Sequence, residues 1–149
     1  MNINIRKAGP EDFSTILTLI KEFSIFQKTP EKVTITLEQM VAEKDISQCL
    51  VAETNDGEIV AFATYFFAYY SWSGKALYLD DLYVKETFRK QAIGKKLLDS
   101  IISIGKNEHC KKIRWQVSGW NSAAIDFYKK MGAVIDETEI NCDLVIRTN

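Results

Sequence analysis

The stretch from Ala76 to Leu98 constrains the fold of this chain more than any other. Its apolar strand pattern, ALYLDDLYV, runs into a short basic connection that opens directly onto an amphipathic helix. The connection contains Arg89 and Lys90, and the first N–H groups of a helix have no intrahelical partners. Because the helix N-terminus also carries partial positive charge, this junction suits a phosphate-bearing ligand. The same pattern is also typical of a basic surface loop that caps a helix.

Hydrophobic periodicity along the rest of the chain predicts strands that alternate with helices. The expected strands are 3–6, 50–52, 59–67, 76–84, 112–117, 133–136 and 143–147. The expected helices are 11–26, a short one capped by Thr36, one from about Gln91 that ends near Gly105, and 122–131, stopped by Gly132. This order predicts an α/β (α+β) fold in a single domain over residues 1–149. The central mixed sheet is antiparallel in its first half, with 76–84 and 112–117 as a parallel pair, and helices cover both faces.

The charge and cysteine content exclude several classes of function. A formal net charge of −1 gives no overall attraction to nucleic acid or to an anionic membrane, and no segment reaches the length of a membrane span. Three cysteines and one histidine without metal-ligand spacing predict no metal site. The cysteines are typical of reduced core residues in a cytoplasmic protein, and His109 is typical of a surface or capping residue.

Two further segments carry side chains suited to chemistry. If Asn121 caps the last helix, then Asn121, Ala124 and Tyr128 form one stripe of small and polar side chains, suited to a narrow ligand. A half-buried core tyrosine is the alternative for Tyr128. Asp80 and Asp81 interrupt an apolar strand, and alternation would place them on opposite faces of the sheet. One carboxylate could then serve chemistry while the other binds a helix terminus or a substrate cation; a β-bulge or a pair of salt bridges is the alternative.

Together these motifs resemble the GNAT superfamily of acetyl-CoA-dependent N-acetyltransferases. The likeness rests on the order of the strands, on Arg-x-x-Gly/Ala-x-Gly at 89–94 and on Asn-x-x-Ala/Ser-x-x-x-Tyr at 121–128. It covers nearly the whole chain. Within the superfamily, the chain is most similar to the diamine (spermidine/spermine) and thialysine acetyltransferases.

The resemblance implies a site for acetyl-CoA and no metal. The backbone of β-strand residues 82–84 would pair with the pantetheine arm, the loop would hold the pyrophosphate, and Tyr128 would protonate the departing thiolate. Ala92 stands where the family has its first glycine, which reduces the room near the phosphates. The implied cofactor-binding residues are Leu82, Tyr83, Val84, Arg89, Lys90, Gln91, Ala92, Ile93, Gly94, Lys95, Asn121 and Ala124.

On the acceptor side, Asp80 matches a glutamate that helps to deprotonate the amine in the polyamine enzymes. Gln27, Trp72 and Asp81 are the expected substrate-binding residues. Gln27 and Tyr70 stand at two positions where those enzymes have acids, and a long polycation needs spaced negative charges. We therefore expect a shorter small-molecule amine, either a small diamine or a thialysine-like amino acid.

The resemblance also implies a homodimer, in which the aromatic run at 65–72 and the last strand could form the contact. Two other functions remain open at this point. One is a non-catalytic acyl-CoA-binding or sensing module, and the other is acetylation of a protein lysine or N-terminus.

Overall fold

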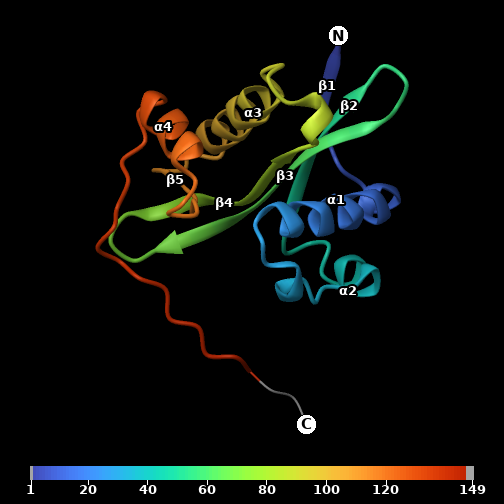
Figure 1. Cartoon of the computed structure of the whole chain (residues 1–149). Coiled ribbons are helices and arrows are strands. Elements are labelled where there is room, and N and C mark those ends of the chain that lie inside the picture. The colour runs from blue at the N-terminus through green and yellow to red at the C-terminus, as the bar shows by residue number, and fades with distance from the viewer. Residues whose placement is uncertain (1, 147–149) are drawn as a thin grey trace. The chain divides into compact units, whose positions relative to one another are not determined.

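The computed structural model describes residues 2–146. The chain divides into two compact units, residues 1–115 and 116–149, and each is described by itself. The first unit holds a five-stranded sheet in the order β1-β2-β3-β4-β5 (Figure 1). Only β4 and β5 are parallel, as the sequence predicts. The strands are β1 (Ile3–Lys7), β2 (Gln48–Thr54), β3 (Ile59–Tyr70), β4 (Gly74–Val84) and β5 (Ile113–Arg114).

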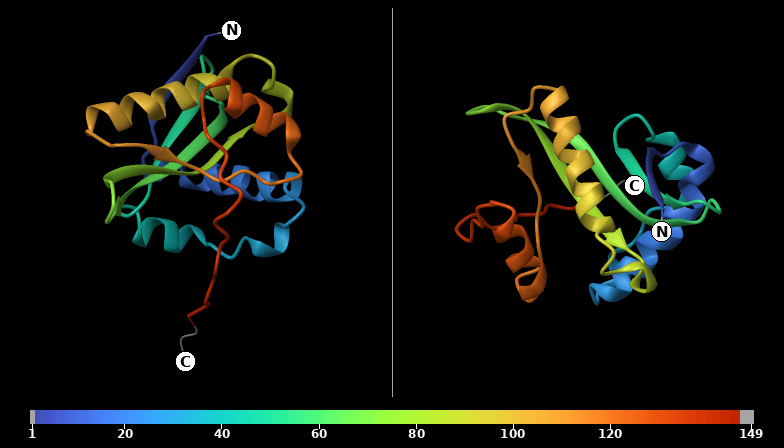
Figure 2. Two further views of the ribbon diagram at one scale, coloured as in Figure 1. Left: turned by 90° about the vertical axis from the view of Figure 1, so that its left-hand side faces the viewer. Right: turned by 90° about the horizontal axis from the view of Figure 1, so that it is seen from above.

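Helices lie on both faces of this sheet (Figure 2). On one face, Ile16 and Leu19 of α1 pack in a core cluster with Phe62 and Tyr83. Leu82, which alternates with Tyr83 along β4, faces α3 instead. The helical elements are η1 (Pro10–Asp12), α1 (Phe13–Phe26), η2 (Pro30–Lys32), α2 (Leu37–Ala42), η3 (Glu86–Phe88) and α3 (Ile93–Asn107). The predicted mixed sheet between helical layers is therefore confirmed.

The end of α3 differs from the prediction, because Gly105 lies inside the helix and not at its end. Gly105 is buried, and a Cβ there would lie 3.3 Å from the Ile113 side chain, so the glycine allows close packing on β5. The helix ends at Asn107, Glu108 is its C-cap, and His109 follows with a left-handed φ of 59°. The Cys110 N–H donates to Gly105 O and the His109 N–H to Lys106 O, both at 2.9–3.1 Å. The predicted stop at Gly105 was therefore wrong, whereas the exposed His109 at the helix end agrees with the prediction of a surface or capping residue.

The second unit contains α4 (Ser122–Lys130). Its start is capped by Asn121 as predicted, and Gly132, with a φ of 94°, ends it. The strands predicted at 133–136 and 143–147 were wrong as far as the structure describes them, since 133–146 contains no strand and 147 lies outside the described residues. Val134 and Leu144 are mostly exposed there. An alternating apolar pattern favours a strand, but a strand also needs a hydrogen-bonding partner, which neither segment has within the described residues of this unit.

The parallel strand β5 is shorter than predicted, at two residues in place of 112–117. It pairs only with Leu77 and Tyr78 of β4. Within residues 2–146, no helix combines the length and the apolar character that a membrane crossing needs. The same part of the chain brings no three His, Cys, Asp or Glu side chains together as a metal site.

Candidate active site

One edge of β4 is open where the sequence predicted the cofactor arm. Because β5 ends its pairing at Tyr78, no described strand pairs with β4 from Leu79 to Val84 on the side away from β3. Apart from Val84 O, which accepts from Arg89 Nε, the backbone groups that face this side have no described strand partner, and an extended ligand could add to the sheet there as a further strand. The predicted pantetheine-binding segment, residues 82–84, lies within this open edge.

The loop that follows β4 presents backbone N–H groups at the start of α3. Lys90 and Ala92 have left-handed φ angles of 65° and 62°, and α3 begins at Ile93. A left-handed residue directly before a helical one, as Ala92 is before Ile93, turns successive N–H groups toward one point, a common anion-binding arrangement. Ala92 is the N-cap of α3 but provides no side-chain cap, so the first helical N–H groups keep their capacity to donate. The loop residues fit a phosphate group by this geometry.

The Arg89 side chain contacts β4 and α1. Its Nε donates to Val84 O at 3.1 Å, and its guanidinium lies over the rings of Phe26 (4.7 Å) and Tyr83 (5.6 Å). The side chain therefore fastens the loop to the sheet and to α1. The motif did not identify Phe26, since its contact with Arg89 joins residues far apart in the chain. Lys95 pairs with Asp99 at 2.8 Å on the exposed face of α3.

The Asp80–Asp81 pair lies at a β-bulge, the alternative that the sequence left open. Thr64 pairs with Asp81 and Tyr65 pairs with Leu79, so Asp80 is the inserted residue. The Asp81 N–H donates to Thr64 Oγ1 at 3.1 Å. Among residues 2–146, neither carboxylate takes part in an ion pair. The bulge also breaks the simple alternation, because Asp81 lies on the face of Phe62 and Tyr83 while Leu79 lies on the other.

The environment of the two carboxyl groups raises both of their pKa values. Burial, and then the neighbouring charge of Asp80, raises the pKa of Asp81 to about 6. Partial burial also raises the pKa of Asp80, whose side chain is more exposed. A carboxyl group with such a pKa can accept a proton near neutral pH. The pair is therefore a candidate proton acceptor.

Aromatic side chains extend from this bulge toward the tip of the β3–β4 hairpin. Phe66 stacks on Tyr78 with ring centroids 5.1 Å apart, on the same face as Asp81. Trp72, an expected substrate-binding residue, is fully exposed at the tip. Six strand residues separate it from Asp80, about 20 Å at the rise of a strand, so this unit does not bring the two together. Gln27 follows α1 as its C-cap and is half-buried.

In the second unit, three predicted residues share one side of α4. Asn121 Oδ1 accepts from the Ala124 N–H at 3.2 Å. Tyr128 is half-buried, and burial raises the pKa of its phenol, which keeps the group neutral at physiological pH. The Ala133 N–H donates to Tyr128 O at 3.1 Å and the Gly132 N–H to Lys129 O at 3.0 Å, which closes the helix at the tyrosine. A neutral phenol on a fixed helix end is a suitable proton donor.

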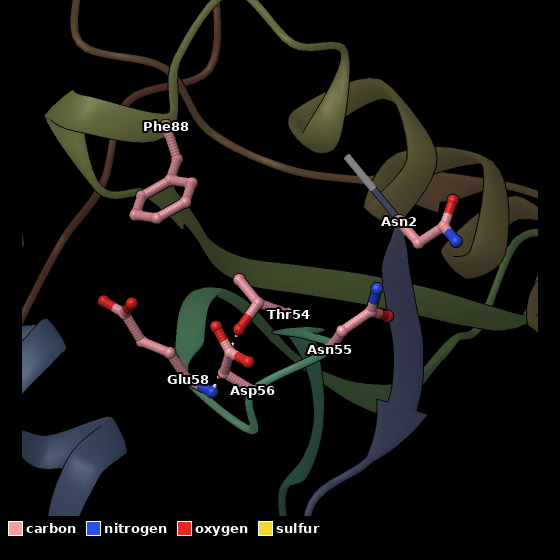
Figure 3. A pocket seen from close by; sticks show the side chains of 6 residues that line it. All are labelled: Asn2, Thr54, Asn55, Asp56, Glu58 and Phe88. Carbon is pink, nitrogen blue, oxygen red and sulfur yellow. Dashed lines mark hydrogen bonds between the residues drawn. The ribbon is translucent and has the colours of Figure 1, made fainter.

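Two cavities lie elsewhere in the first unit. Figure 3 shows one of about 330 Å³ at the β2–β3 hairpin, where Asp56 and Glu58 make the lining acidic and Phe88 closes one side. An acidic lining disfavours a phosphate there. The other, of about 480 Å³, includes Tyr65 and Ile104 near the C-terminal end of α3. Neither cavity includes a residue of the open edge of β4.

An open strand edge, an adjoining helix start without a side-chain cap and a carboxylate pair lie in one unit, an arrangement that fits the class of acyl-group transferases. Comparison with known proteins supports this class. Residues 13–133 match the acetyltransferase (GNAT) family, and the chain belongs to that family. It is an N-acetyltransferase of the GNAT type.

The similar proteins include N-acetyltransferases. The chain is 35% identical over 142 residues to a thialysine N-epsilon-acetyltransferase of Bos taurus, covering 88% of this chain and 84% of that protein. It is 33% identical over 140 residues to a spermidine/spermine N(1)-acetyltransferase-like protein 1 of Homo sapiens, covering 87% of this chain and 20% of that protein. A crystal structure of an aminoglycoside acetyltransferase from an uncultured soil metagenomic sample has a similar fold, with a TM-score of 0.78 at 19% identity and 97% coverage of both chains.

Proposed function

We propose that this protein transfers an acetyl group from acetyl-CoA to the primary amine of a small molecule. The observation that carries the proposal is the junction of β4 and α3, where an open strand edge meets an uncapped helix start with left-handed residues at Lys90 and Ala92. This geometry supports binding of the pantetheine arm along residues 82–84 and of the pyrophosphate at residues 89–95. Asn121 and Ala124 are proposed to line the arm from α4.

The proposed chemistry is direct transfer. Bound acetyl-CoA supplies a thioester carbonyl for the amine to attack. An alkyl ammonium has a pKa near 10.4 and must lose a proton before its nitrogen can attack. The Asp80–Asp81 pair is proposed to take that proton, directly or through water, and Asp81 to attract the cation beforehand. No enzyme nucleophile is needed, so the cysteines have no catalytic role.

The remaining steps concern charge and protons. N–H groups on the open edge of β4 are proposed to stabilise the negative charge that develops on the thioester oxygen. As the carbon–nitrogen bond forms, the attacking nitrogen becomes positively charged and loses its second proton to water. The carbon–sulfur bond then breaks and the thiolate leaves, and the proton lost from the nitrogen balances the one that the sulfur gains. Tyr128 is proposed to donate its phenol proton to that sulfur. This assignment is supported by the raised pKa of the phenol, which keeps the proton in place until the thiolate appears.

The test is Tyr128→Phe in an assay of thiol release. We expect turnover to fall at least about tenfold, since a positioned general acid commonly contributes that much or more. Stabilisation of the protein by acetyl-CoA in a thermal-shift assay should stay nearly the same. Unchanged turnover would remove the assignment of Tyr128. Stabilisation by CoA without thiol release from any amine would contradict the proposed transfer.

Three expectations from the sequence stay predictions within this proposal: that residues 1–149 act as one domain, that the protein is cytoplasmic and that it is a homodimer. Light scattering of the purified protein tests the last of these. A monomer at micromolar concentration would contradict it.

A further inference from the structure

A hydrogen bond joins α1 to the end of β4. The Tyr83 hydroxyl donates to Glu22 Oε2 at 2.7 Å, across 61 residues of the chain. Tyr83 is buried and Glu22 is half-buried. Burial, and then the bond to Glu22, raise the pKa of the phenol to about 12, so the hydroxyl keeps its proton at physiological pH. Because a bond to a carboxylate is stronger than one between neutral groups, this contact fixes the Tyr83 ring against α1.

The Tyr83 ring belongs to an aromatic group that also contacts Arg89. Phe23 stacks on Tyr83 with ring centroids 5.1 Å apart. The Arg89 guanidinium lies 5.6 Å from the centre of the Tyr83 ring and 4.7 Å from that of Phe26. In the described part of the chain, residues 2–146, Arg89 takes part in no ion pair. The aromatic faces, and not an opposite charge within ion-pair distance, therefore position its guanidinium.

Arg89 connects this aromatic group to the loop before α3. Its Nε donates to Val84 O at 3.1 Å, at the last residue of β4. The loop that follows has a strained backbone, since Lys90 and Ala92 are not glycine and have φ angles of 65° and 62°. Such angles persist only where the surroundings hold them. A fixed Arg89 therefore helps to keep the loop in the shape that presents its N–H groups.

We propose that Glu22 and the Tyr83 side chain are positioning residues for acetyl-CoA: Glu22 fixes the Tyr83 ring, the ring fixes Arg89, and Arg89 holds the phosphate-binding loop in shape. This inference rests on the proposed function. It gives the Tyr83 side chain a role separate from that of its backbone on the open edge. A loop that is already ordered loses less conformational entropy when a ligand binds, so the contribution is to affinity. The proposed proton acceptor and donor lie outside these contacts, so the chemical step stays the same.

The test separates affinity for acetyl-CoA from the chemical step. Tyr83→Phe keeps the ring beside Arg89 but removes the bond to Glu22. We expect its Kd for acetyl-CoA, measured by calorimetry, to rise about three- to tenfold, because a charge-assisted hydrogen bond is lost at one remove from the loop. In the assay of thiol release, KM for acetyl-CoA should rise by the same factor, while kcat stays within about twofold of the wild type.

Further variants make the result specific. Glu22→Ala should raise Kd as much as Tyr83→Phe does, and the double variant should show no further rise, because each change removes the same bond. Glu22→Gln retains an acceptor oxygen and should keep most of the affinity. Val51→Ala is the matched control, since Val51 belongs to the same core cluster but lies on β2, two strands from β4. Its melting temperature should fall while Kd stays the same.

Three results would contradict the inference. An unchanged Kd in Tyr83→Phe and Glu22→Ala, beside normal thiol release by the wild type, would overturn it and leave the proposed function in place. An equal rise of Kd in Val51→Ala would overturn it too, because a general loss of stability would then explain the effect. A wild type that neither binds acetyl-CoA nor releases thiol would overturn the proposed function and the inference together.

Discussion

Ala92 is the N-cap of α3 and Gly94 lies in its first turn, and a side chain has different consequences at the two positions. Ala92 holds a φ of 62°, where a Cβ costs about 1–2 kcal/mol, so the chain accepts strain at the start of α3. A Cβ at Gly94 would lie 3.7 Å from the side chains of Leu82 and Val84, which is ordinary contact. Nothing in the fold therefore requires glycine at position 94, and the lack of a side chain there favours close approach of a ligand.

Gly94→Ala tests whether glycine is needed at position 94 for the fold or for close approach of the ligand. We expect the melting temperature without ligand to stay the same or rise slightly, because alanine is the better helix former and the space accepts its methyl group. Affinity for acetyl-CoA, measured by calorimetry, should fall about tenfold if the backbone must approach the phosphates closely. Unchanged affinity would mean that Gly94 does not touch the ligand.

At the scale of the element, β4 combines a bulge, an open edge and an unpaired carboxylate in one strand. Its pairing with β3 holds the strand on one side, while the short β5 leaves the other side open beyond Tyr78. The bulge brings Asp81 to the face of α1, where burial and Asp80 raise its pKa to about 6. A group whose folded pKa is raised in this way costs stability when it is ionised.

Asp81→Asn should therefore be more stable than the wild type at neutral pH. Folded Asp81 is harder to ionise than its unfolded form, so the cost grows as pH rises from about 4 to about 6 and is constant above that. Urea unfolding across this range should show the variant's advantage appear and then level off. Asp45→Asn, an exposed acid, is the control. An advantage that is the same at pH 4 and pH 7 would contradict the raised pKa.

At the scale of the molecule, local periodicity predicted the order of the elements and the parallel pair, because each core strand and helix has its own apolar pattern. Local periodicity could not predict which residues far apart in the chain contact each other. The stacking of Arg89 on Phe26 and of Arg114 on Tyr70 joins distant residues. For the same reason, the pattern at 133–136 predicted a strand without showing a partner for it. The motif predicted the cofactor residues, which stay a prediction, whereas the pairing of Lys112 and Arg114 with Tyr70 needed the fold.

The first strands and the first helix are joined by one ion network. Arg6 donates to Asp12 at 2.8 Å and to Glu53 at 2.9 Å, and the buried Asp12 also accepts from the Gly9 N–H at 2.9 Å. Chiefly through its hydrogen bonds with Arg6, the pKa of Asp12 lies below its ordinary value. The network thus fastens the start of α1 to the edge formed by β1 and β2.

Asp12→Asn should destabilise the whole first unit in a manner that depends on pH. A carboxylate with a lowered folded pKa stabilises the protein above its unfolded pKa, near 3.9, and this contribution is lost as pH falls through the folded value. We expect a loss of about 1–3 kcal/mol in the free energy of unfolding at pH 7, because a partly buried network of charge-assisted hydrogen bonds is broken. The difference from wild type should shrink below about pH 4. Asp56→Asn, which alters an exposed acid at the β2–β3 turn, is the control. A deficit that persists undiminished at pH 3 would show that the loss comes from packing and not from the charge of Asp12.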